Sequence, residues 1–529
     1  MTVRPRVLAA VLVAFAGFRI VSTYHVFSQA FDEPAHVAAG MEWLDRGRYT
    51  YETQHPPLAR AAVALGPYLS GLRSTGASWL FHEGNLILME RGTYVRNLAL
   101  ARLGALPFFA LTALVVWLWT RRWFGEGAAL AAVALLTTLP PVLAHAGFAT
   151  TDMALTATLT LALYQGVRWL DDRGTARSLA AGAAVGLAVS AKFSAGLFLP
   201  LGVAAILAVR ALLKRDDAAL RPAPAPLALW RPAAFAASAC LLVIWAAYRF
   251  SVGPIGALTV PAPEFFDGLR RLAAHEGAGH DAYFLGQTGS GGWWYFFPVT
   301  FAVKTPIPFL LLTAAGLWLT GRRAWLTRDF RPAAPALAAA ALFAAAIPSN
   351  LNIGLRHILP VYPLLAVGAG YALALFWNAP VKRRAWRAAA ALVFGWQAAS
   401  TTLAHPDYLP WFNAFAGRHP ERIVVAGDLD WGQDLLRLAD TVRARHIDSL
   451  ALAYFGSADP RRLLPAALRP LAPDEHAGGW IAVSEAVLKG VGFEPHRGFE
   501  WLEAVPPVAR VGHTIRLYHF PAPATRSGP

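Results

Sequence analysis

The sequence contains almost no cysteine and little charge. Cys240 is the single cysteine among 529 residues, and it lies inside an apolar segment. An intramolecular disulfide and a cysteine cluster for zinc are therefore excluded. Charged residues make up 15% of the chain, hydrophobic residues make up 56%, and the mean hydropathy is +0.41. This composition excludes an ordinary soluble enzyme and predicts a polytopic membrane protein that is stabilised by packing.

Several common sequence motifs are also missing. The chain has no Walker loop, no nucleophile elbow and no Gly-x-Gly-x-x-Gly after a predicted strand. Neither an ATP-driven pump nor a serine hydrolase is supported, and we expect no nucleotide cofactor. The net charge of +15 comes from short basic clusters between apolar runs. A nucleic-acid-binding surface would interleave basic and aromatic residues along a polar face, so we expect no nucleic-acid partner.

Apolar segments long enough to cross a membrane recur along the chain. A spanning helix needs about 20 mostly apolar residues. We predict eleven spans, near residues 7–25, 98–119, 127–144, 153–169, 178–191, 195–212, 232–249, 295–319, 333–348, 358–377 and 387–403. Lys192 interrupts the region 178–212, which could instead be one long tilted helix. We favour two spans there.

The basic clusters support this count. If the N-terminus is cytoplasmic, every cluster between spans falls on the cytoplasmic side, as the positive-inside rule requires. The clusters are Arg121 with Arg122, Arg173 with Arg177, Lys214 and Arg215 with Arg221 and Arg231, Arg322 and Arg323 with Arg328 and Arg331, and Lys382, Arg383 and Arg384 with Arg387. This orientation places loop 26–97, loop 250–294 and the tail from residue 404 outside.

The composition changes in the tail. Residues 423–426 and 449–455 have short buried-strand patterns, and residues 434–445 between them have the pattern of an amphipathic helix. A strand, a helix and a strand in this order predict a βαβ-like unit. The predicted fold class is an all-α polytopic membrane bundle, residues 1–403, with a small C-terminal α/β extracytoplasmic domain, residues 404–529.

Two adjacent carboxylates, Asp32 and Glu33, follow the first predicted span. Asp-Glu-Pro is a good helix start, with aspartate as the N-cap and proline in the first turn. The functional alternative is that one carboxylate removes a proton from a hydroxyl group while the other is structural. Segments 34–44 and 57–72 of the same loop have helical spacing. We predict that they lie along the membrane surface.

A third carboxylate, Asp152, lies at the outer end of the span 153–169. A carboxylate among apolar residues is costly and is a candidate for function, although it could also cap the helix that follows. Residues 428–430 form an Asp-x-Asp triplet after a predicted strand and before a predicted helix. We interpret that triplet as a capping turn in preference to a metal site.

Cations and histidines also gather near the outer ends of the predicted spans. His55 precedes Pro56 and Pro57, which fix the local backbone and so orient the imidazole, although it could equally be a solvated loop residue. The other candidates are Lys192, Lys304, Arg356 and His357. Cations at this depth suit an anionic lipid headgroup or a diphosphate. The two lysines could also simply extend to the interface, so Arg356 with His357 is the better predicted phosphate ligand.

The combination of these features resembles a known family. A first span is followed by Phe-Asp-Glu-Pro-x-His at 31–36 and His-Pro-Pro-Leu at 55–58, with Asp152 in the second outer loop. This pattern resembles the GT-C membrane glycosyltransferases over residues 26–378. Within them it is most similar to the superfamily of protein O-mannosyltransferases and lipid A aminoarabinose transferases. Residues 406–413 and 428–435 also resemble a tail found on bacterial members.

The resemblance implies specific roles. It implies a donor sugar linked to polyprenyl phosphate, an acceptor hydroxyl and inversion at the anomeric carbon. Asp32 matches the presumed base, Glu33 its neighbour and Asp152 the second-loop acid. His55 stands where relatives have His or Lys near the donor phosphate. The chain has no large inserted domain between spans, unlike the eukaryotic mannosyltransferases, and this does not favour a protein acceptor.

We therefore expect a glycosyltransferase of the bacterial inner membrane that acts at the periplasmic face. The acceptor could be a lipid, a glycan or a protein. The carboxylates and histidines could hold a divalent metal, so a metal cofactor stays open. The alternatives are a polytopic lipid or sugar transporter or flippase, and an assembly subunit whose tail docks a partner.

Overall fold

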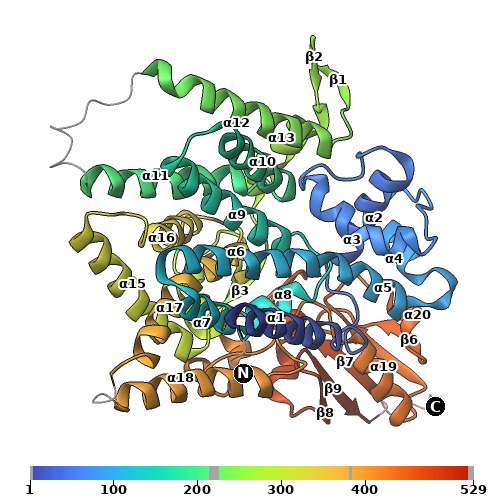
Figure 1. The fold of residues 1–529 in the computed structure, drawn as a ribbon. Helices are drawn as coiled ribbons and strands as arrows, with labels where there is room; N and C mark the ends of the chain where they lie inside the picture. Colours follow the sequence, from blue (N-terminus) through green and yellow to red (C-terminus); the bar gives the residue numbers. More distant parts are fainter. Residues whose placement is uncertain (1–3, 214–225, 381–383, 522–529) are drawn as a thin grey trace, which may run out of the picture.

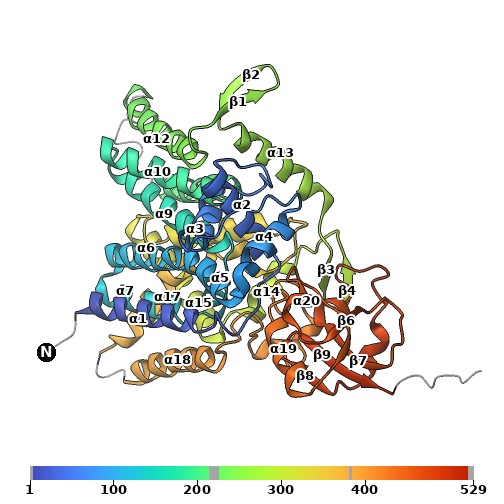
Figure 2. The same cartoon turned by 90° about the vertical axis from the view of Figure 1, so that its right-hand side faces the viewer.

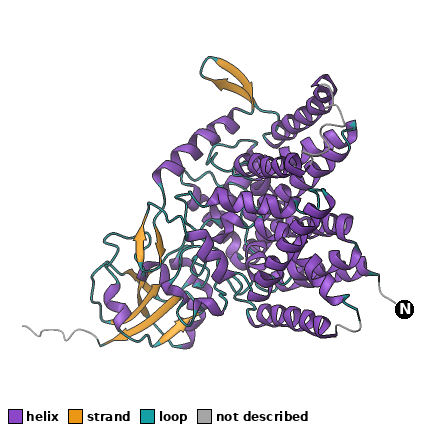
Figure 3. Cartoon of the chain, turned by 90° about the vertical axis from the view of Figure 1, so that its left-hand side faces the viewer, coloured by secondary structure: helices purple, strands orange, loops and turns teal. Residues whose placement is uncertain are grey.

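The computed structural model describes residues 4–213, 226–380 and 384–521. The chain is mostly helical, and its strands form two small hairpins and one sheet near the C-terminus (Figure 3). The long helices lie side by side, and the sheet lies beside one end of this helical body (Figure 1). Several positions of the predicted basic clusters lie outside the described residues, namely Lys214, Arg215, Arg221, Lys382 and Arg383.

Helices occupy all of the predicted apolar ranges. They are α1 (Pro5–Val21), α6 (Leu106–Phe124), α7 (Glu126–Leu136) with α8 (Pro140–Ala146), α9 (Asp152–Asp171), α10 (Thr175–Ala191), α11 (Ala195–Leu213), α12 (Pro226–Ala247), α14 (Phe296–Lys304) with α15 (Ile307–Thr327), α16 (Ala334–Ala346), α17 (Val361–Trp377) and α18 (Arg384–Leu403). Region 178–212 contains two helices, as predicted. The backbone becomes extended at Lys192, which ends α10.

The number of spans is a separate question from the number of helices. Among the described residues, three helices are long and apolar enough to cross a membrane, namely Tyr94–Phe124, Ala195–Leu213 and Trp230–Ala247. The pair α7 and α8 bends by 69° and the pair α14 and α15 by 115°, which gives up to five if each pair is one span. Prolines lie at both bends, where they interrupt the helical hydrogen bonds. The predicted count of eleven spans is not confirmed.

The first predicted outer loop, residues 26–97, folds into a compact group of helices. These are α2 (Glu33–Met41), the π-helical turn Glu42–Arg46, α3 (Pro57–Leu69), α4 (Leu80–Met89) and α5 (Tyr94–Arg102). The predicted helices at 34–44 and 57–72 are confirmed. Their axes approach closely because glycines lie at the crossings: a Cβ on Gly40 would come within 2.0 Å of the Arg60 carbonyl oxygen, and one on Gly84 within 2.1 Å of the Pro34 carbonyl oxygen. Helix α2 is thereby clamped between α3 and α4.

A second outer segment follows α12. It contains β1 (Val252–Ile255), β2 (Leu258–Pro261), α13 (Pro263–Ala278), β3 (Ala282–Phe284) and β4 (Gln287–Gly289). Strands β1 and β2 form one antiparallel hairpin, and β3 and β4 form another. The β1–β2 hairpin projects from the edge of the molecule opposite the C-terminal sheet (Figure 2).

The tail contains a mixed five-stranded sheet in the order β6-β5-β7-β9-β8. Its elements are α19 (Leu435–Ala444), β5 (Ser449–Ala453), α20 (Pro460–Leu463), β6 (Ala467–Pro470), β7 (Gly479–Ser484), α21 (Glu485–Leu488), β8 (Ala509–Val511) and β9 (Ile515–Phe520). Strand β5 is parallel to β6 and β7, whereas β9 is antiparallel to β7 and β8. The apolar face of α19 packs against one side of the sheet.

The predicted helix at 434–445 and the predicted strand at 449–455 are confirmed, but the predicted strand at 423–426 is wrong. Val424 and Ala426 make only isolated bridges, and the chain turns at Gly427, where φ is +77°. Val425 lies in a loop, where its side chain is buried in one cluster with Tyr283 of β3. Residues 423–426 are therefore apolar because they are buried, although they do not pair as a strand. The first strand of the C-terminal sheet is β5.

The start of the tail belongs to the helical core. Five tail residues are buried in the same apolar cluster as side chains of the long helices, namely Ala404, Tyr408, Leu409, Val424 and Trp431. The sheet has its own two smaller clusters. Residue 403 therefore marks the end of the long helices, but the apolar core continues across it into the start of the tail.

Candidate functional site

Four segments that are distant in sequence meet at one end of the helical body. Asp32 precedes α2, Asp152 begins α9, Lys192 follows α10, and Arg356 lies in the 3-10 turn Leu355–Ile358. A short turn joins α9 to α10, and the two helices pack against each other. The start of α9 and the end of α10 therefore lie at the same end, which brings Lys192 to Asp152.

Arg356 lies between the two carboxylates. Its Nη1 donates to Asp32 Oδ2 over 2.5 Å and lies 3.9 Å from Asp152 Oδ2. Lys192 Nζ donates to Asp152 Oδ1 over 2.7 Å. Two carboxylates and two cations thus alternate in one cluster, and their charges balance. Buried charges require such pairing, because desolvation alone would cost several kcal/mol per ion.

The two carboxylates of this cluster differ in exposure. The side chain of Asp32 is 27% exposed, whereas that of Asp152 is 1% exposed. Burial opposes the ionisation of Asp32, but Arg356, followed by His36, outweighs burial and holds the pKa of Asp32 below its ordinary value. Asp32 is therefore ionised at neutral pH and is the carboxylate that a molecule from outside can reach.

Glu33 is enclosed by donors. Its side chain is 0% exposed. Arg102 donates to both carboxylate oxygens, over 2.9 and 2.8 Å, and the amides of Ala30 and Ala149 donate over 2.7 and 2.8 Å. This pair fastens the loop before α2 to α5 and to the segment just before Asp152. Glu33 is adjacent to Asp32 in sequence, but its oxygens already have four donors.

His55 lies beside a second buried network. Its Nδ1 is 3.3 Å from Glu52 Oε2, and its ring centroid is 5.3 Å from that of His36. Arg60, which is 1% exposed, donates to the carboxylate of Glu52 and, over 3.1 Å, to His36 Nδ1. Burial lowers the pKa of both histidines, so both rings are neutral at pH 7.

The remaining predicted phosphate ligands, Lys304 and His357, occupy different surroundings. Lys304 Nζ donates to the carbonyl oxygens of Leu409 and Asp428 over 2.5 and 2.6 Å. It therefore joins α14 to the tail, and it makes no ion pair with Asp32 or Asp152 among the described residues. His357 follows Arg356, and its buried Nε2 has no hydrogen-bond partner within the described part of the chain.

The tail contributes a residue that the sequence did not predict. The guanidinium carbon of Arg356 lies 4.4 Å from the ring centroid of Trp431, which is 3% exposed. The same indole contacts the rings of His145 and Phe148, with centroids 5.9 and 5.6 Å away. No local pattern identifies Trp431, because its position depends on how the tail docks against the helices. His145 was missed for the same reason.

The Asp-x-Asp triplet is fully engaged with the protein. The Asp428 carboxylate accepts from the Leu355 amide over 3.0 Å, which steadies the turn that carries Arg356. The Asp430 carboxylate accepts from the amides of Gly432 and Ala486, each over 3.0 Å. These contacts agree with the predicted turn role. Among the described residues, no group of three or more His, Cys, Asp or Glu side chains could hold a metal ion.

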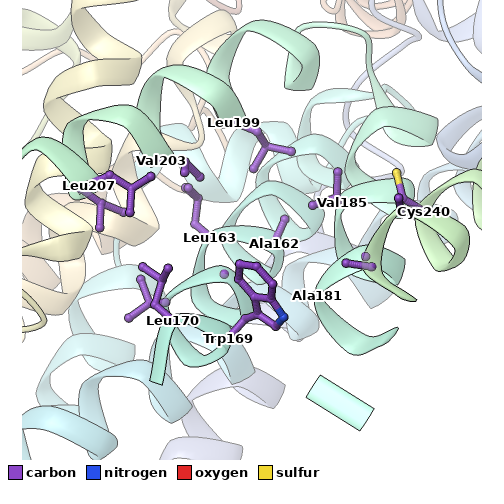
Figure 4. A pocket seen from close by; sticks show the side chains of 16 residues that line it. Ala162, Leu163, Trp169, Leu170, Ala181, Val185, Leu199, Val203, Leu207 and Cys240 are labelled. Atoms are coloured by element: carbon purple, nitrogen blue, oxygen red, sulfur yellow. The ribbon is translucent and has the colours of Figure 1, made fainter. Parts of the chain in front are cut away.

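An apolar cavity of about 420 Å³ lies among α9, α10, α11 and α12 (Figure 4). Leu163, Val185, Leu199 and Leu207 line it with other aliphatic side chains, and Cys240 lies at its edge. Three of the surrounding helices, α9, α10 and α11, begin or end beside Lys192 and Asp152. The cavity is lined by the half of α9 farther from Asp152, so it lies along the same helices but away from the charged cluster, and it is suited to hydrocarbon.

The sequence and the fold of this chain are similar to those of known proteins. Residues 76–221 match the family model of the dolichyl-phosphate-mannose-protein mannosyltransferases. The crystal structure of ArnT from Cupriavidus metallidurans bound to undecaprenyl phosphate matches with a TM-score of 0.50 and 17% identity, over 98% of this chain and 99% of that chain. The chain therefore has the same fold as ArnT, and the two findings together make it similar to the GT-C membrane glycosyltransferases.

A second structure gives the same result. The apo form of the same ArnT matches with a TM-score of 0.50 and 16% identity, over 96% of this chain and 97% of that chain. No curated protein sequence matches this chain significantly. At these identities the structural likeness establishes the fold over nearly the whole chain. The predicted resemblance is thereby confirmed, and the fold is consistent with the predicted membrane location.

Proposed function

We propose that this protein transfers a sugar from a polyprenyl-phosphate donor to an acceptor hydroxyl, with inversion at the anomeric carbon. The reaction takes place at the membrane surface where Asp32, Asp152, Lys192 and Arg356 meet. The observation that carries this proposal is the position of Arg356, which pairs with Asp32 and lies 3.9 Å from Asp152. One guanidinium thus connects the candidate base to the candidate phosphate-binding side of the site.

Asp32 is the base in this proposal. The acceptor oxygen forms a bond to the anomeric carbon, the bond from that carbon to the phosphate oxygen breaks, and the hydroxyl proton passes to Asp32. A carboxylate with a low pKa is a weak base toward a resting hydroxyl, but it can accept the proton as the attacking oxygen gains positive character. Asp32 fits because it is the exposed carboxylate of the cluster, whereas Glu33 and Asp152 are enclosed.

Arg356 and Lys192 bind the donor phosphate in this proposal. Both are cations at the rim of the cluster, with 8% and 12% of their side chains exposed. Charge-assisted hydrogen bonds from such groups stabilise the negative charge that develops on a departing phosphate. The neutral rings of His55 and His357 add hydrogen-bonding capacity nearby. Lys304 is not included, because its ammonium group is committed to two carbonyl oxygens.

The lipid part of the donor fits the apolar cavity among α9 to α12. Its lining residues are almost entirely aliphatic, and its helices present Asp152 and Lys192 at one end. The relative ArnT was crystallised with undecaprenyl phosphate, a lipid of the proposed class. We further propose that the protein lies in a bacterial inner membrane with its N-terminus in the cytoplasm and its tail in the periplasm.

The test begins with mass spectrometry of the lipid that co-purifies with the full chain, which identifies the donor. The purified protein in nanodiscs is then assayed with that donor and a panel of lipid, glycan and peptide acceptors. Asp32→Asn is expected to lower transfer at least a hundredfold, in the range typical of loss of a general base. Asp440→Asn is the matched control, since that carboxylate is 78% exposed on α19. Full transfer by Asp32→Asn would remove Asp32 from the role of base.

A further inference from the structure

The β1–β2 hairpin carries an unusual surface. Residues 250–263 contain no charged side chain. Leu258 is 70% exposed, Val252 59% and Phe250 52%. A two-stranded hairpin in water is at best marginally stable and normally covers one apolar face with other elements. This hairpin leaves both strands exposed along most of their length.

The hairpin continues a surface that faces lipid. It begins five residues after α12, whose segment Trp230–Ala247 qualifies as a membrane span with none of its residues buried inside the protein. Trp245 at the end of α12 packs edge-to-face against Phe250, with ring centroids 5.2 Å apart. Aromatic residues at the end of a span are typical of the membrane interface. The apolar surface therefore extends from α12 onto the hairpin, and the one charged residue between them, Arg249, donates to the Trp43 carbonyl oxygen over 2.7 Å.

The direction of the hairpin agrees with this position. It extends sideways from the end of α12, roughly across the axes of the long helices, and passes beyond the helical body (Figures 1 and 2). An element that projects across the helix axes at the end of a span lies parallel to the membrane plane. With the long helices crossing the membrane, this sideways projection brings the hairpin to the interfacial layer beside the end of α12.

Helix α13 completes an amphipathic unit. Phe266 and Leu269 are 46% and 42% exposed, and Arg270 and Arg271 lie beside them with 81% and 55% of their side chains exposed. Exposed apolar residues next to arginines suit a helix that lies in the interface, where the cations contact anionic headgroups. The arginines also pair with Asp267 on the same helix, so the unit carries a modest net charge.

The hairpin and α13 are firmly joined to the candidate site. Thr53 Oγ1 donates to Asp267 over 2.8 Å, and a Cβ on Gly268 would come within 2.3 Å of the Thr53 carbonyl oxygen. The ring of Phe193, next to Lys192, lies against the same glycine. We propose that the β1–β2 hairpin inserts among lipid acyl chains in the leaflet at the site end of the helical body and sets the depth of the site. The partner is the lipid surface itself.

The test uses fluorescence and does not depend on catalysis. The full chain with Cys240→Ala is reconstituted into vesicles of phosphatidylcholine and phosphatidylglycerol in a 3:1 ratio. An environment-sensitive NBD label is attached at Leu258→Cys or Ile255→Cys on the hairpin. Leu241→Cys on α12, where the side chain is 66% exposed, is the membrane control. Arg461→Cys in the tail, which is exposed, is the aqueous control.

The expected result is that both hairpin labels emit at shorter wavelength than the label at Arg461→Cys. They should be quenched severalfold more by lipids brominated near the headgroup than by aqueous iodide. The label at Leu241→Cys should respond best to bromine placed deeper in the acyl chains. If the hairpin labels are quenched by iodide as strongly as the tail label, the hairpin lies in water and the proposal is overturned. That outcome would point to a protein partner and would leave the proposed transfer reaction untouched.

Discussion

The indole of Trp431 lies against the guanidinium of Arg356, with 4.4 Å between the guanidinium carbon and the ring centroid. The first residue comes from the tail and the second from the turn before α17. The contact makes the tail part of the wall of the candidate site. A cation over an indole ring, shielded from water, contributes about 1–2 kcal/mol. The tail therefore helps to orient the residue that connects the two carboxylates.

We expect Trp431→Leu to lower kcat/KM for sugar transfer about tenfold, because about 1.4 kcal/mol of orientation energy is lost. Trp431→Phe should recover most of this loss, since a phenyl ring still presents an aromatic face. Trp230→Leu is the matched control, because it removes a cation–π contact with Arg231 at an exposed position. Equal activity of the Leu and Phe variants would show that the indole fills space and does not orient Arg356.

Glu33→Gln should mainly destabilise the protein. Removing one partner of a buried ion pair costs about 3–5 kcal/mol, because Arg102 would retain an unpaired charge. We expect a clear fall in the thermal unfolding midpoint in detergent, whereas Asp32→Asn should unfold near the wild-type temperature. If the Glu33→Gln protein unfolds at the wild-type temperature but has lost its activity, Glu33 has a chemical role instead.

Lys192 and Lys304 should give different phenotypes. Lys192→Met should raise KM for the lipid donor about tenfold or more, since a charge-assisted phosphate contact contributes about 1.5–3 kcal/mol. Lys304→Met should leave KM nearly unchanged but lower the unfolding midpoint, because two buried carbonyl oxygens lose their donor. The assays are donor titration and thermal unfolding of each variant. A rise in KM for Lys304→Met alone would reverse the assignment.

Stability should depend on the ionisation of Asp430 in the tail. Burial outweighs its two amide donors and raises the pKa of Asp430 from the ordinary 3.8 to about 8. Between these values the folded protein holds more protons than the unfolded chain, so this contribution to stability is present at low pH and is lost as pH rises toward 8. One proton gives a slope of at most about 1.4 kcal/mol per pH unit.

The measurement is the unfolding midpoint from pH 4 to pH 9 for the wild type and for Asp430→Asn. The Asp430→Asn variant should lack the part of the pH dependence of the unfolding midpoint that comes from Asp430. It should also be less stable at low pH, because an amide offers one acceptor oxygen where two backbone amides donate. Parallel curves for the two proteins would mean that Asp430 is already ionised across the range.

Removing residues 404–529 should abolish transfer. The truncation deletes Trp431, the acceptors of Lys304 and the carboxylate that holds the Leu355 amide. A milder variant, Asp428→Ala, removes only that last contact and should lower kcat more than it lowers stability. Both are measured as purified protein in nanodiscs. Full activity of the truncated chain would show that the tail is accessory to the reaction.

The sequence determined the helices and the location of the loop that carries Asp32 and Glu33. The signals were local: long apolar runs, proline turns and the change of composition after residue 403. Each can be recognised within one segment, because an apolar run must be buried whichever segments it packs against. The same locality explains the wrong strand at 423–426. A short apolar run must be buried, but whether it pairs as a strand depends on neighbours such as Tyr283 that are distant in the sequence.

Tertiary structure alone decided which carboxylate is available. Asp32 and Glu33 are equivalent in the sequence, but successive side chains at a helix start diverge by about 100°, and here one meets Arg356 while the other meets Arg102. Tertiary structure also separated Lys192 from Lys304 and brought Trp431 to Arg356. These outcomes depend on how distant segments pack, and no pattern within one segment encodes that packing.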